Sequence, residues 1–245
     1  MAESFSVALT DSLNNVKEAL PREFNITRFV QNGVALLNGN KQLIDYARKF
    51  GTDNIKNGMM QASYLGLDFL SKECYLIPYG SELNFMIDYR GAVKLCKKYS
   101  IRPIKDIYAK IVRVGDEFSE EVVNGEQTIN FKPLPFNNGE TIGAFAVCLF
   151  ADGGMLVDSM SLAELNVSRS KSKASNSTAW KDFPSQMYLK TVLHRLCKTI
   201  ELDFDSIQQR QLFDNDVAIE TDPKKLSEME IEQNANKEEF IIDEA

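Results

Sequence analysis

Apolar residues in the N-terminal quarter of the chain recur at intervals of three and four positions, the spacing of one face of an α-helix. Three such stretches follow one another, and the third opens at Thr52-Asp53, a pair typical of a helix start. We therefore expect a layer of N-terminal helices with their apolar faces in the core. The apolar positions are Ile26, Phe29, Val30, Gly33 and Leu37, then Leu43, Ala47 and Phe50, then Ile55, Met59 and Ala62.

The period then changes to two, which is typical of β-strands. Tyr75, Ile77 and Tyr79 alternate with other residues, Gly80-Ser81 forms a turn signal, and residues 83–89 alternate again, so this stretch predicts a β-hairpin. Four later segments alternate or are rich in β-formers, and Asp152-Gly153-Gly154 turns the last pair. We expect these segments, residues 108–114, 127–132, 142–150 and 155–160, to form a central sheet rich in antiparallel pairs.

Helices flank these strands. Residues 91–99 predict a short helix after the hairpin, and Ser161 with Glu164 forms a capping-box signature for another that ends near Val167. Residues 168–178 show no apolar period and predict a mobile basic loop. Pro184 then opens a helix of about four turns. Its inward stripe is Leu189, Val192, Leu193, Leu196 and Ile200. The fold class predicted is α+β.

The net charge of −7 at pH 7 is spread unevenly over the 245 residues. Residues 214–245 contain eleven acidic residues and three lysines, a net charge of −8, with no sustained apolar period. This composition predicts a disordered acidic tail. We place the boundary near Phe213, so that residues 1–213 form one folded domain and residues 214–245 a flexible appendage.

Cysteine and histidine usage argues against a metal centre. The four cysteines are far apart, no Cys-x-x-Cys occurs, and the sequence has a single histidine, so neither a zinc site nor a disulfide framework is supported. The N-terminus shows no basic region followed by an apolar run, and no segment is long enough to span a bilayer. We expect a soluble cytoplasmic protein with reduced thiols.

Positive charge gathers between residues 160 and 200, where seven basic residues face two acidic ones, a net charge of +5. A basic patch on an acidic protein predicts a polyanion as ligand. Lys190, His194 and Lys198 recur every fourth residue of the long helix, on the side away from its apolar stripe, with Arg195 adjacent. A second, smaller basic face lies on the helix 91–99 and just before it. This second face contains Arg90, Lys94, Lys97 and Lys98.

Aromatic residues interleave with these cations, a combination that suits a single strand, because phosphates need cations and exposed bases stack on rings. The candidates are Tyr75, Tyr79, Trp180 and Tyr188. Trp180 fits two interpretations equally well at this point, a base platform or an anchor in the core. Tyr75 and Tyr89 fit the hairpin core better, and Arg90 is the better candidate for a DNA contact.

Three stretches in order, YLIPYGSELNFMIDYRGAVKLCKKYS, VRVGDEF and SRSKSKASNSTAWKDFPSQMYLKTVLHRLCK, resemble the RecT family of phage and prophage single-strand annealing proteins. The resemblance covers roughly residues 62–200. His194 stands where the family commonly has arginine, which removes up to one charge at neutral pH. The positions that match the family pattern of the long helix are Lys190, Thr191, Val192, Arg195, Leu196 and Lys198.

The resemblance implies a non-enzymatic recombinase that binds single-stranded DNA, anneals complementary strands and needs no nucleotide triphosphate. The sequence agrees on the last point, because it contains no Gly-x-x-x-x-Gly-Lys-Ser/Thr phosphate loop. The family implies a homo-oligomer, ring or filament, working with a phage exonuclease and a host single-strand-binding protein. No cofactor is implied, and whether magnesium tunes DNA binding is left open. The DNA-binding residues expected are Tyr79, Arg90, Lys94, Lys97, Arg169, Lys171, Lys173, Trp180, Lys190, Arg195 and Lys198.

Two other functions stay open from the residues alone. A metal-dependent nuclease could use the carboxylates of residues 116–121, 203 and 205, although they read as a strand-end loop and a helix end without a general base nearby. An adaptor that binds an acidic partner would show no strand pairing. The acidic tail fits either an electrostatic brake on the basic site or an anchor for a partner protein through Phe240, Ile241 and Ile242.

Overall fold

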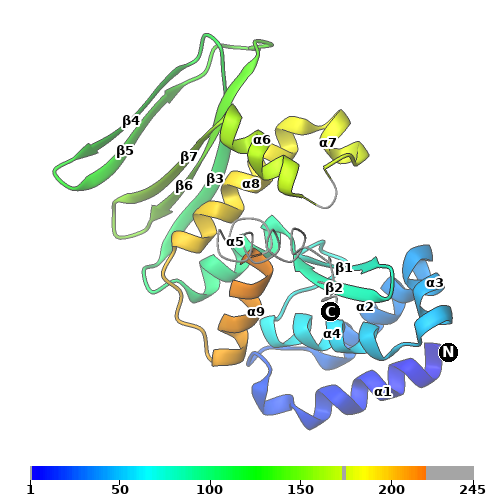
Figure 1. Cartoon of the computed structure of the whole chain (residues 1–245). Coiled ribbons are helices and arrows are strands. Elements are labelled where there is room, and N and C mark those ends of the chain that lie inside the picture. The colour runs from blue at the N-terminus through cyan, green and yellow to red at the C-terminus, as the bar shows by residue number, and fades with distance from the viewer. Residues whose placement is uncertain (1, 173–174, 219–245) are drawn as a thin grey trace, which may run out of the picture.

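A computed structural model of the chain describes residues 2–172 and 175–218, and Figure 1 shows its arrangement. Helices and antiparallel strands are mixed along the chain, so the α+β class predicted from the sequence is confirmed. An N-terminal group of helices lies at one end, a group of strands at the other, and a long helix runs across the strands between them (Figure 1). No helix in the described part of the chain is long and apolar enough to cross a membrane.

The predicted helical layer is present as α2 (Ile26–Gly39), α3 (Lys41–Phe50) and α4 (Asp53–Leu65). Its predicted apolar faces are buried for the most part, but Phe50 is 38% exposed at the end of α3. One helix was missed, α1 (Ala2–Asn15), followed by a 3-10 turn over Lys17–Ala19. Its buried side chains Phe5, Leu9 and Leu13 are spaced four apart and belong to the main core.

The predicted hairpin consists of β1 (Cys74–Tyr79) and β2 (Glu82–Ile87), antiparallel with Tyr79 opposite Glu82 across the Gly80-Ser81 turn. Helix α5 (Tyr89–Tyr99) follows after a single residue, Asp88, whose side chain accepts a hydrogen bond from the backbone N–H of Arg90. The helix starts two residues earlier than expected, because Asp88 serves as its N-cap.

The central sheet has three antiparallel strands in the order β3-β6-β7: β3 (Ile104–Arg113), β6 (Thr141–Phe150) and β7 (Met155–Ser161). A separate hairpin is formed by β4 (Glu117–Val123) and β5 (Glu126–Lys132). The prediction of a loop at residues 116–121 was wrong. Strand β4 was hidden because every one of its residues is exposed, so its sequence lacks the apolar alternation of a half-buried strand.

The two faces of this sheet bury different side chains. One face contributes Ala144, Ala146 and Cys148 to the main core, where small residues let α8 (Pro184–Thr199) pack closely. The other face forms a smaller core of Val112, Phe145, Val147 and Val157, against which Ile129 and Phe131 of β5 pack. The β4-β5 hairpin therefore covers the face of the sheet that the helices leave open (Figure 1).

The C-terminal elements are α6 (Leu162–Lys171), α7 (Thr178–Asp182), α8 and α9 (Ile207–Ala218). The capping box at Ser161 and Glu164 is confirmed, but α6 runs four residues past the predicted end at Val167, so the basic loop is shorter than predicted. Helix α9 crosses the predicted boundary, with Phe213 buried in the main core. Residues 219–245, which include Phe240, Ile241 and Ile242, lie outside the described residues.

Candidate nucleic-acid interface

The start of α5 meets the middle of α8, and this contact joins the two basic segments that the sequence singled out. The Lys190 Nζ lies 3.6 Å from Asp88 Oδ2 and 5.5 Å from the centroid of the Tyr89 ring. Further along, the Cys96 thiol lies 3.7 Å from the carbonyl oxygen of Cys197, so the two helices run side by side. We call the surface formed by Asp88, Tyr89, Arg90, Lys190 and His194 the α5–α8 cluster.

Within this cluster, Arg90 is exposed and its guanidinium lies 5.4 Å from the Tyr89 ring centroid. The ring is thus flanked by two cations, Arg90 and Lys190, each in cation–π range. Asp88 is only 7% exposed, and it both caps α5 and pairs with Lys190. The Asp88 carboxylate is therefore engaged with Lys190, while the Arg90 side chain stays exposed to solvent. An exposed guanidinium is the geometry expected of a phosphate contact.

The cluster depends on a close backbone approach at Gly91. A Cβ atom at this position would lie 2.2 Å from the Glu73 carbonyl oxygen, so only glycine lets α5 start against the segment before β1. The Asp88 backbone N–H donates to the same carbonyl at 2.9 Å. Within IDYRG, Asp88 and Gly91 are therefore both held against the Glu73 carbonyl group.

His194 lies on the α8 row between Lys190 and Lys198 and is half-buried. The pKa of His194 is lowered to about 4, mainly by burial, with smaller contributions from Lys198 and Lys190 in the same direction and an opposing one from Asp88. The imidazole is therefore neutral at pH 7 and adds no cation to the row. The position that departs from the family pattern contributes packing and hydrogen-bonding capacity instead of charge.

Two predicted DNA-binding lysines of α5 are engaged within the protein. Lys94 Nζ lies 2.7 Å from Glu73 and donates to the Gly66 carbonyl oxygen at 2.9 Å, while Lys97 Nζ lies 3.1 Å from Asp106 of β3. The Lys97 ion pair lowers the pKa of Asp106. Both lysines remain more than 40% exposed, so they keep access to solvent while they tie α5 to its neighbours.

Arg195 points away from the α5–α8 cluster. Its Nε lies 2.7 Å from Asp158 Oδ2 of β7, its Nη2 also contacts Asp158 and donates to the Ser159 carbonyl oxygen at 3.0 Å, and Glu164 of α6 lies 3.8 Å away. Asp158 is 13% exposed. The arrangement makes Arg195 a bidentate clamp between α8, β7 and the start of α6.

Trp180 is 3% exposed and lies in the core formed by α6, α7 and α8. Its ring packs against Tyr188 at 5.9 Å, the Tyr188 hydroxyl lies 3.1 Å from Asn166 Oδ1, and the Arg169 guanidinium lies 5.5 Å above the indole. Of the two interpretations of Trp180, the geometry favours the core anchor. Arg169 covers the ring and is itself only partly buried, so a phosphate can reach it.

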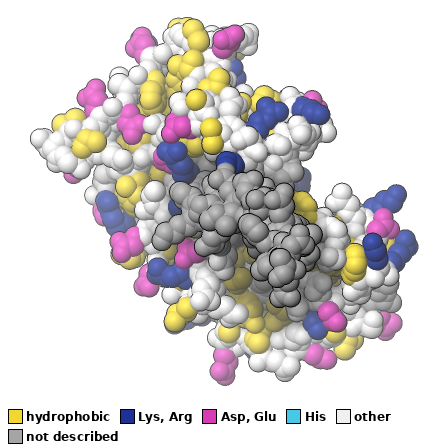
Figure 2. All heavy atoms as spheres, in the orientation of Figure 1, with side chains coloured by type: hydrophobic (Ala, Val, Ile, Leu, Met, Phe, Trp, Pro, Cys, Tyr) yellow, Lys and Arg dark blue, Asp and Glu magenta, His cyan; other side chains and the backbone are white. Residues whose placement is uncertain are grey.

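The other predicted residues lie around this centre. Tyr79 is half-buried at the hairpin tip, Lys171 ends α6, Lys198 is exposed in the last turn of α8, and Lys173 lies outside the described residues. The sequence interpretation did not single out Asp88, and it assigned Tyr89 to the hairpin core; Tyr89 is partly buried against the main core, and its ring also lies beside Arg90 and Lys190. Figure 2 shows that basic and acidic side chains are mixed over the visible face of the molecule, so charge density alone does not locate the site.

The carboxylates considered for a metal-dependent nuclease are engaged in the β4 region. Asp116 accepts hydrogen bonds from Asn137, Arg113 and Leu134, which lower its pKa, and Glu117 pairs with Lys132. Glu120 accepts from the Ser159 hydroxyl at 2.6 Å. In the described part of the chain, no group of three or more His, Cys, Asp or Glu side chains is placed to hold a metal ion.

Comparison of the sequence with known proteins identifies a family. The family model described as RecT family matches residues 27–234, a span that includes both the IDYRG turn and all of α8. The chain is also 28% identical over 215 residues to Protein RecT of Escherichia coli strain K12. That alignment covers 84% of this chain and 77% of the relative.

Proposed function

The chain belongs to the RecT family, and from this premise we propose that it acts in homologous recombination by binding single-stranded DNA and annealing complementary strands without ATP. The observation that carries the proposal is the α5–α8 cluster. It brings Arg90 and Lys190, which are 100 positions apart, to 5.4 and 5.5 Å from the centroid of one tyrosine ring. Both residues lie in the segment that the family model matches.

Annealing requires sequence-blind binding, since the two strands must recognise each other and not the protein. Arg90 and Lys190 fit this need because cations contact phosphates irrespective of base. Neutralised phosphates also repel an incoming strand less. With the backbone held, the pairing edges of the bases stay free to test a second strand.

The path of the strand follows from the positions of the remaining cations. Arg169 of α6 lies over Trp180 of α7, just before the start of α8, Lys171 ends α6, and Lys198 lies in the last turn of α8. We place the DNA along α8, from the end near α6 and α7, past Tyr89 at the start of α5, and on along α5. Lys94 and Lys97 add positive electrostatic potential at the edge of this path while they keep their ion pairs. Tyr79 lies on the side of the path formed by the β1-β2 hairpin.

The family premise extends the proposal to assembly and partners. We propose a homo-oligomer that places copies of the α5–α8 cluster along one strand, in the cytoplasm, with an exonuclease that supplies single strands and a single-strand-binding protein that hands them over. No bond is made or broken by the protein in this scheme, so no catalytic residue is assigned.

Two complementary oligonucleotides, mixed with the full chain in the absence of ATP, test the proposal. We expect the protein to accelerate pairing, measured by fluorescence quenching, without shortening either strand on a denaturing gel. Arg90→Ala and Lys190→Ala should slow pairing, and the matched control Lys132→Ala should not, because Lys132 lies on the β4-β5 hairpin across the sheet from α8.

Three results would contradict the proposal. Cleavage of either strand would indicate a nuclease, and DNA binding without faster pairing would indicate an adaptor. Equal pairing rates for Lys190→Ala, Arg90→Ala and Lys132→Ala would remove the α5–α8 cluster from the interface even if annealing itself were observed.

A further inference from the structure

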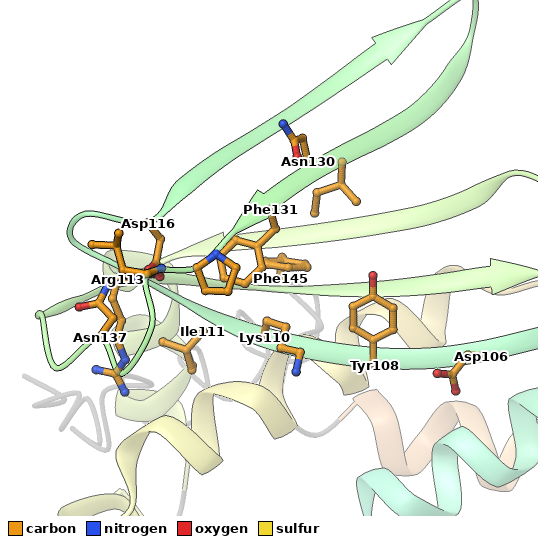
Figure 3. A pocket seen from close by; sticks show the side chains of 13 residues that line it. Asp106, Tyr108, Lys110, Ile111, Arg113, Asp116, Asn130, Phe131, Asn137 and Phe145 are labelled. Atoms are coloured by element: carbon orange, nitrogen blue, oxygen red, sulfur yellow. Dashed lines mark hydrogen bonds between the residues drawn. The ribbon is translucent and has the colours of Figure 1, made fainter.

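An open hollow of about 920 Å³ lies on the face of the sheet opposite α8, between β3 and the β4-β5 hairpin (Figure 3). Its floor is apolar: Phe131 and Phe145 meet at 5.0 Å between ring centroids, with Ile129 beside them. Tyr108 and Lys110 of β3 also line it (Figure 3). None of these residues belongs to the α5–α8 cluster.

Strand β3 is an edge strand of the described sheet, and its outer edge borders this hollow. The backbone N–H of Ile107 donates to Asp106 Oδ1 and that of Arg113 to Asp116 Oδ2, so these two groups point away from β6. Backbone groups alternate along a strand, and the N–H groups of Ala109 and Ile111 therefore point the same way. The two aspartates close the ends of the edge and leave its middle open.

The opposite edge of the sheet, strand β7, is covered by a side chain. There, the Gln127 side chain donates to the Val157 carbonyl oxygen at 3.4 Å and accepts from the Val157 N–H at 2.8 Å, which covers the centre of β7. Strand β5, which also lines the hollow, is paired only with β4 in the described part of the chain. In the described part of the chain, the outer edge of β3 thus has no partner strand and borders an apolar floor, a geometry that suits an added strand.

The charges around the hollow select an acidic occupant. Asp106 is paired with Lys97 and Asp116 accepts three hydrogen bonds, so both acids are already engaged. Among the described residues, no carboxylate forms an ion pair with Lys110, and the Arg113 guanidinium donates to the Gly139 carbonyl oxygen. An extended peptide with apolar side chains flanked by carboxylates would match both the floor and these two cations.

The chain itself contains such a peptide. Residues 238–245 read EEFIIDEA, with Phe240, Ile241 and Ile242 between two pairs of acids. Two isoleucines favour an extended strand, and alternation would place Phe240 and Ile242 on the same side. The segment lies beyond the last described residue, Ala218, by about 20 positions, and a flexible chain of that length spans roughly 25 Å on average and far more when extended.

We propose that residues 238–245 add to the outer edge of β3, with Phe240 and Ile242 on the floor of Phe131 and Phe145 and the flanking acids beside Lys110 and Arg113. The proposal concerns the face opposite the DNA path and does not depend on the annealing function. It assigns to the last residues a place that is neither the basic surface of α8 nor a partner protein.

Amide hydrogen exchange in the full chain tests this placement residue by residue. Replacing Phe240, Ile241 and Ile242 by serine should speed exchange at the Ala109 and Ile111 amides at least tenfold, while Tyr108 and Lys110, whose amides point toward β6, stay protected. Lys110→Glu combined with Arg113→Glu should have the same effect. Lys105→Glu, an exposed lysine of the same strand outside the hollow, should not.

A synthetic peptide of residues 236–245, added to the triple-serine variant, should restore protection at Ala109 and Ile111, whereas a scrambled peptide of the same composition should not. Thermal unfolding of every variant verifies that the fold is intact. Exchange at Ala109 and Ile111 that is equal in the parent and the triple-serine variant would overturn the proposal. So would protection changes confined to residues 88–92 and 190–198, which would place the segment on the α5–α8 cluster.

Discussion

At the scale of single residues, His194 makes the stability of the protein depend on pH. Its folded pKa of about 4 lies below the ordinary value of 6.5, so the unfolded chain binds a proton that the folded chain does not. Stability is therefore complete above pH ~6.5 and falls as the pH drops toward 4, by about 1–2 kcal/mol at pH 5. Urea unfolding at pH 7 and pH 5 measures this loss.

The matched variant His194→Gln keeps a polar side chain that does not titrate. We expect its free energy of unfolding to change less between pH 7 and pH 5 than that of the parent. The aspartates and Glu164 whose pKa is lowered titrate below this window and affect both proteins alike. An identical pH dependence in parent and variant would show that His194 is accessible to protons in the fold.

Lys190 should contribute one phosphate contact. If it neutralises one phosphate, Lys190→Ala lowers the slope of log affinity against log salt by about 0.7 for single strands. The loss should be the same for all sequences, because the contact does not read bases. Fluorescence anisotropy with two oligonucleotides of unrelated sequence, over a series of salt concentrations, gives both quantities. A slope equal to that of the parent would assign Lys190 to its ion pair with Asp88 alone.

The sequence placed Arg90 and Lys190 in one set of candidate DNA contacts with Arg195 and Trp180 and could not tell the four apart. All four lie in matching motifs, and side-chain direction decides between them. Arg195 follows His194 by one position, about 100° around the helix, and this turn carries it to Asp158 on β7. Its partner Asp158 lies 37 positions earlier in the chain, in a strand, so no local sequence pattern predicts this ion pair.

At the scale of elements, the Arg195 clamp should matter for stability more than for DNA. Arg195→Ala leaves the largely buried Asp158 carboxylate without its partner, and we expect a loss of about 2–4 kcal/mol, near the lower part of the range for buried pairs because Arg195 is partly exposed. The salt slope of DNA binding should stay unchanged. Chemical denaturation and the salt titration together separate the two roles.

The double variant Arg195→Ala, Asp158→Ala completes the cycle. If the ion pair is the main effect, removing both partners should cost less than the sum of the two single changes. If Arg195→Ala instead lowered the salt slope of DNA binding and kept a stability near that of the parent, Arg195 would be a phosphate contact.

Elements with regular burial were predictable, and those without it were not. The hairpin at residues 74–87 alternates because one side packs on α4, and α8 shows its stripe because it crosses a sheet. Strand β4 is exposed throughout, and α9 has apolar residues on no single side, so neither produces a period. Their positions are fixed by tertiary contacts, Phe118 on Phe145 and Phe213 on Phe204, that sequence spacing does not encode.

At the scale of the whole molecule, one core connects the N-terminal helices to the sheet. Side chains from α1 through α9 belong to it, including Leu9, Ile55, Leu95, Leu196 and Phe213. The single folded unit expected for residues 1–213 is compatible with this continuity. Because Phe213 is buried and α9 continues to Ala218, we now propose that the unit ends at Ala218 and not at Phe213.

Two truncations of the full chain test this boundary. Ending the chain after Ala218 should lower the free energy of unfolding by only about 1–2 kcal/mol, the equivalent of a tenfold change in protection, and leave annealing intact, since it removes nothing from the described core. Ending it after Ser206 also removes α9, with the buried Gln209 that donates to the Tyr64 carbonyl oxygen and with Phe213. Losing a buried phenylalanine alone costs about 3–5 kcal/mol, so the melting temperature should fall by roughly 6–20 °C. Differential scanning calorimetry compares the two. If the Ala218 truncation melted as early as the Ser206 truncation, residues 219–245 would belong to the folded unit, and the tail could not be a separate appendage.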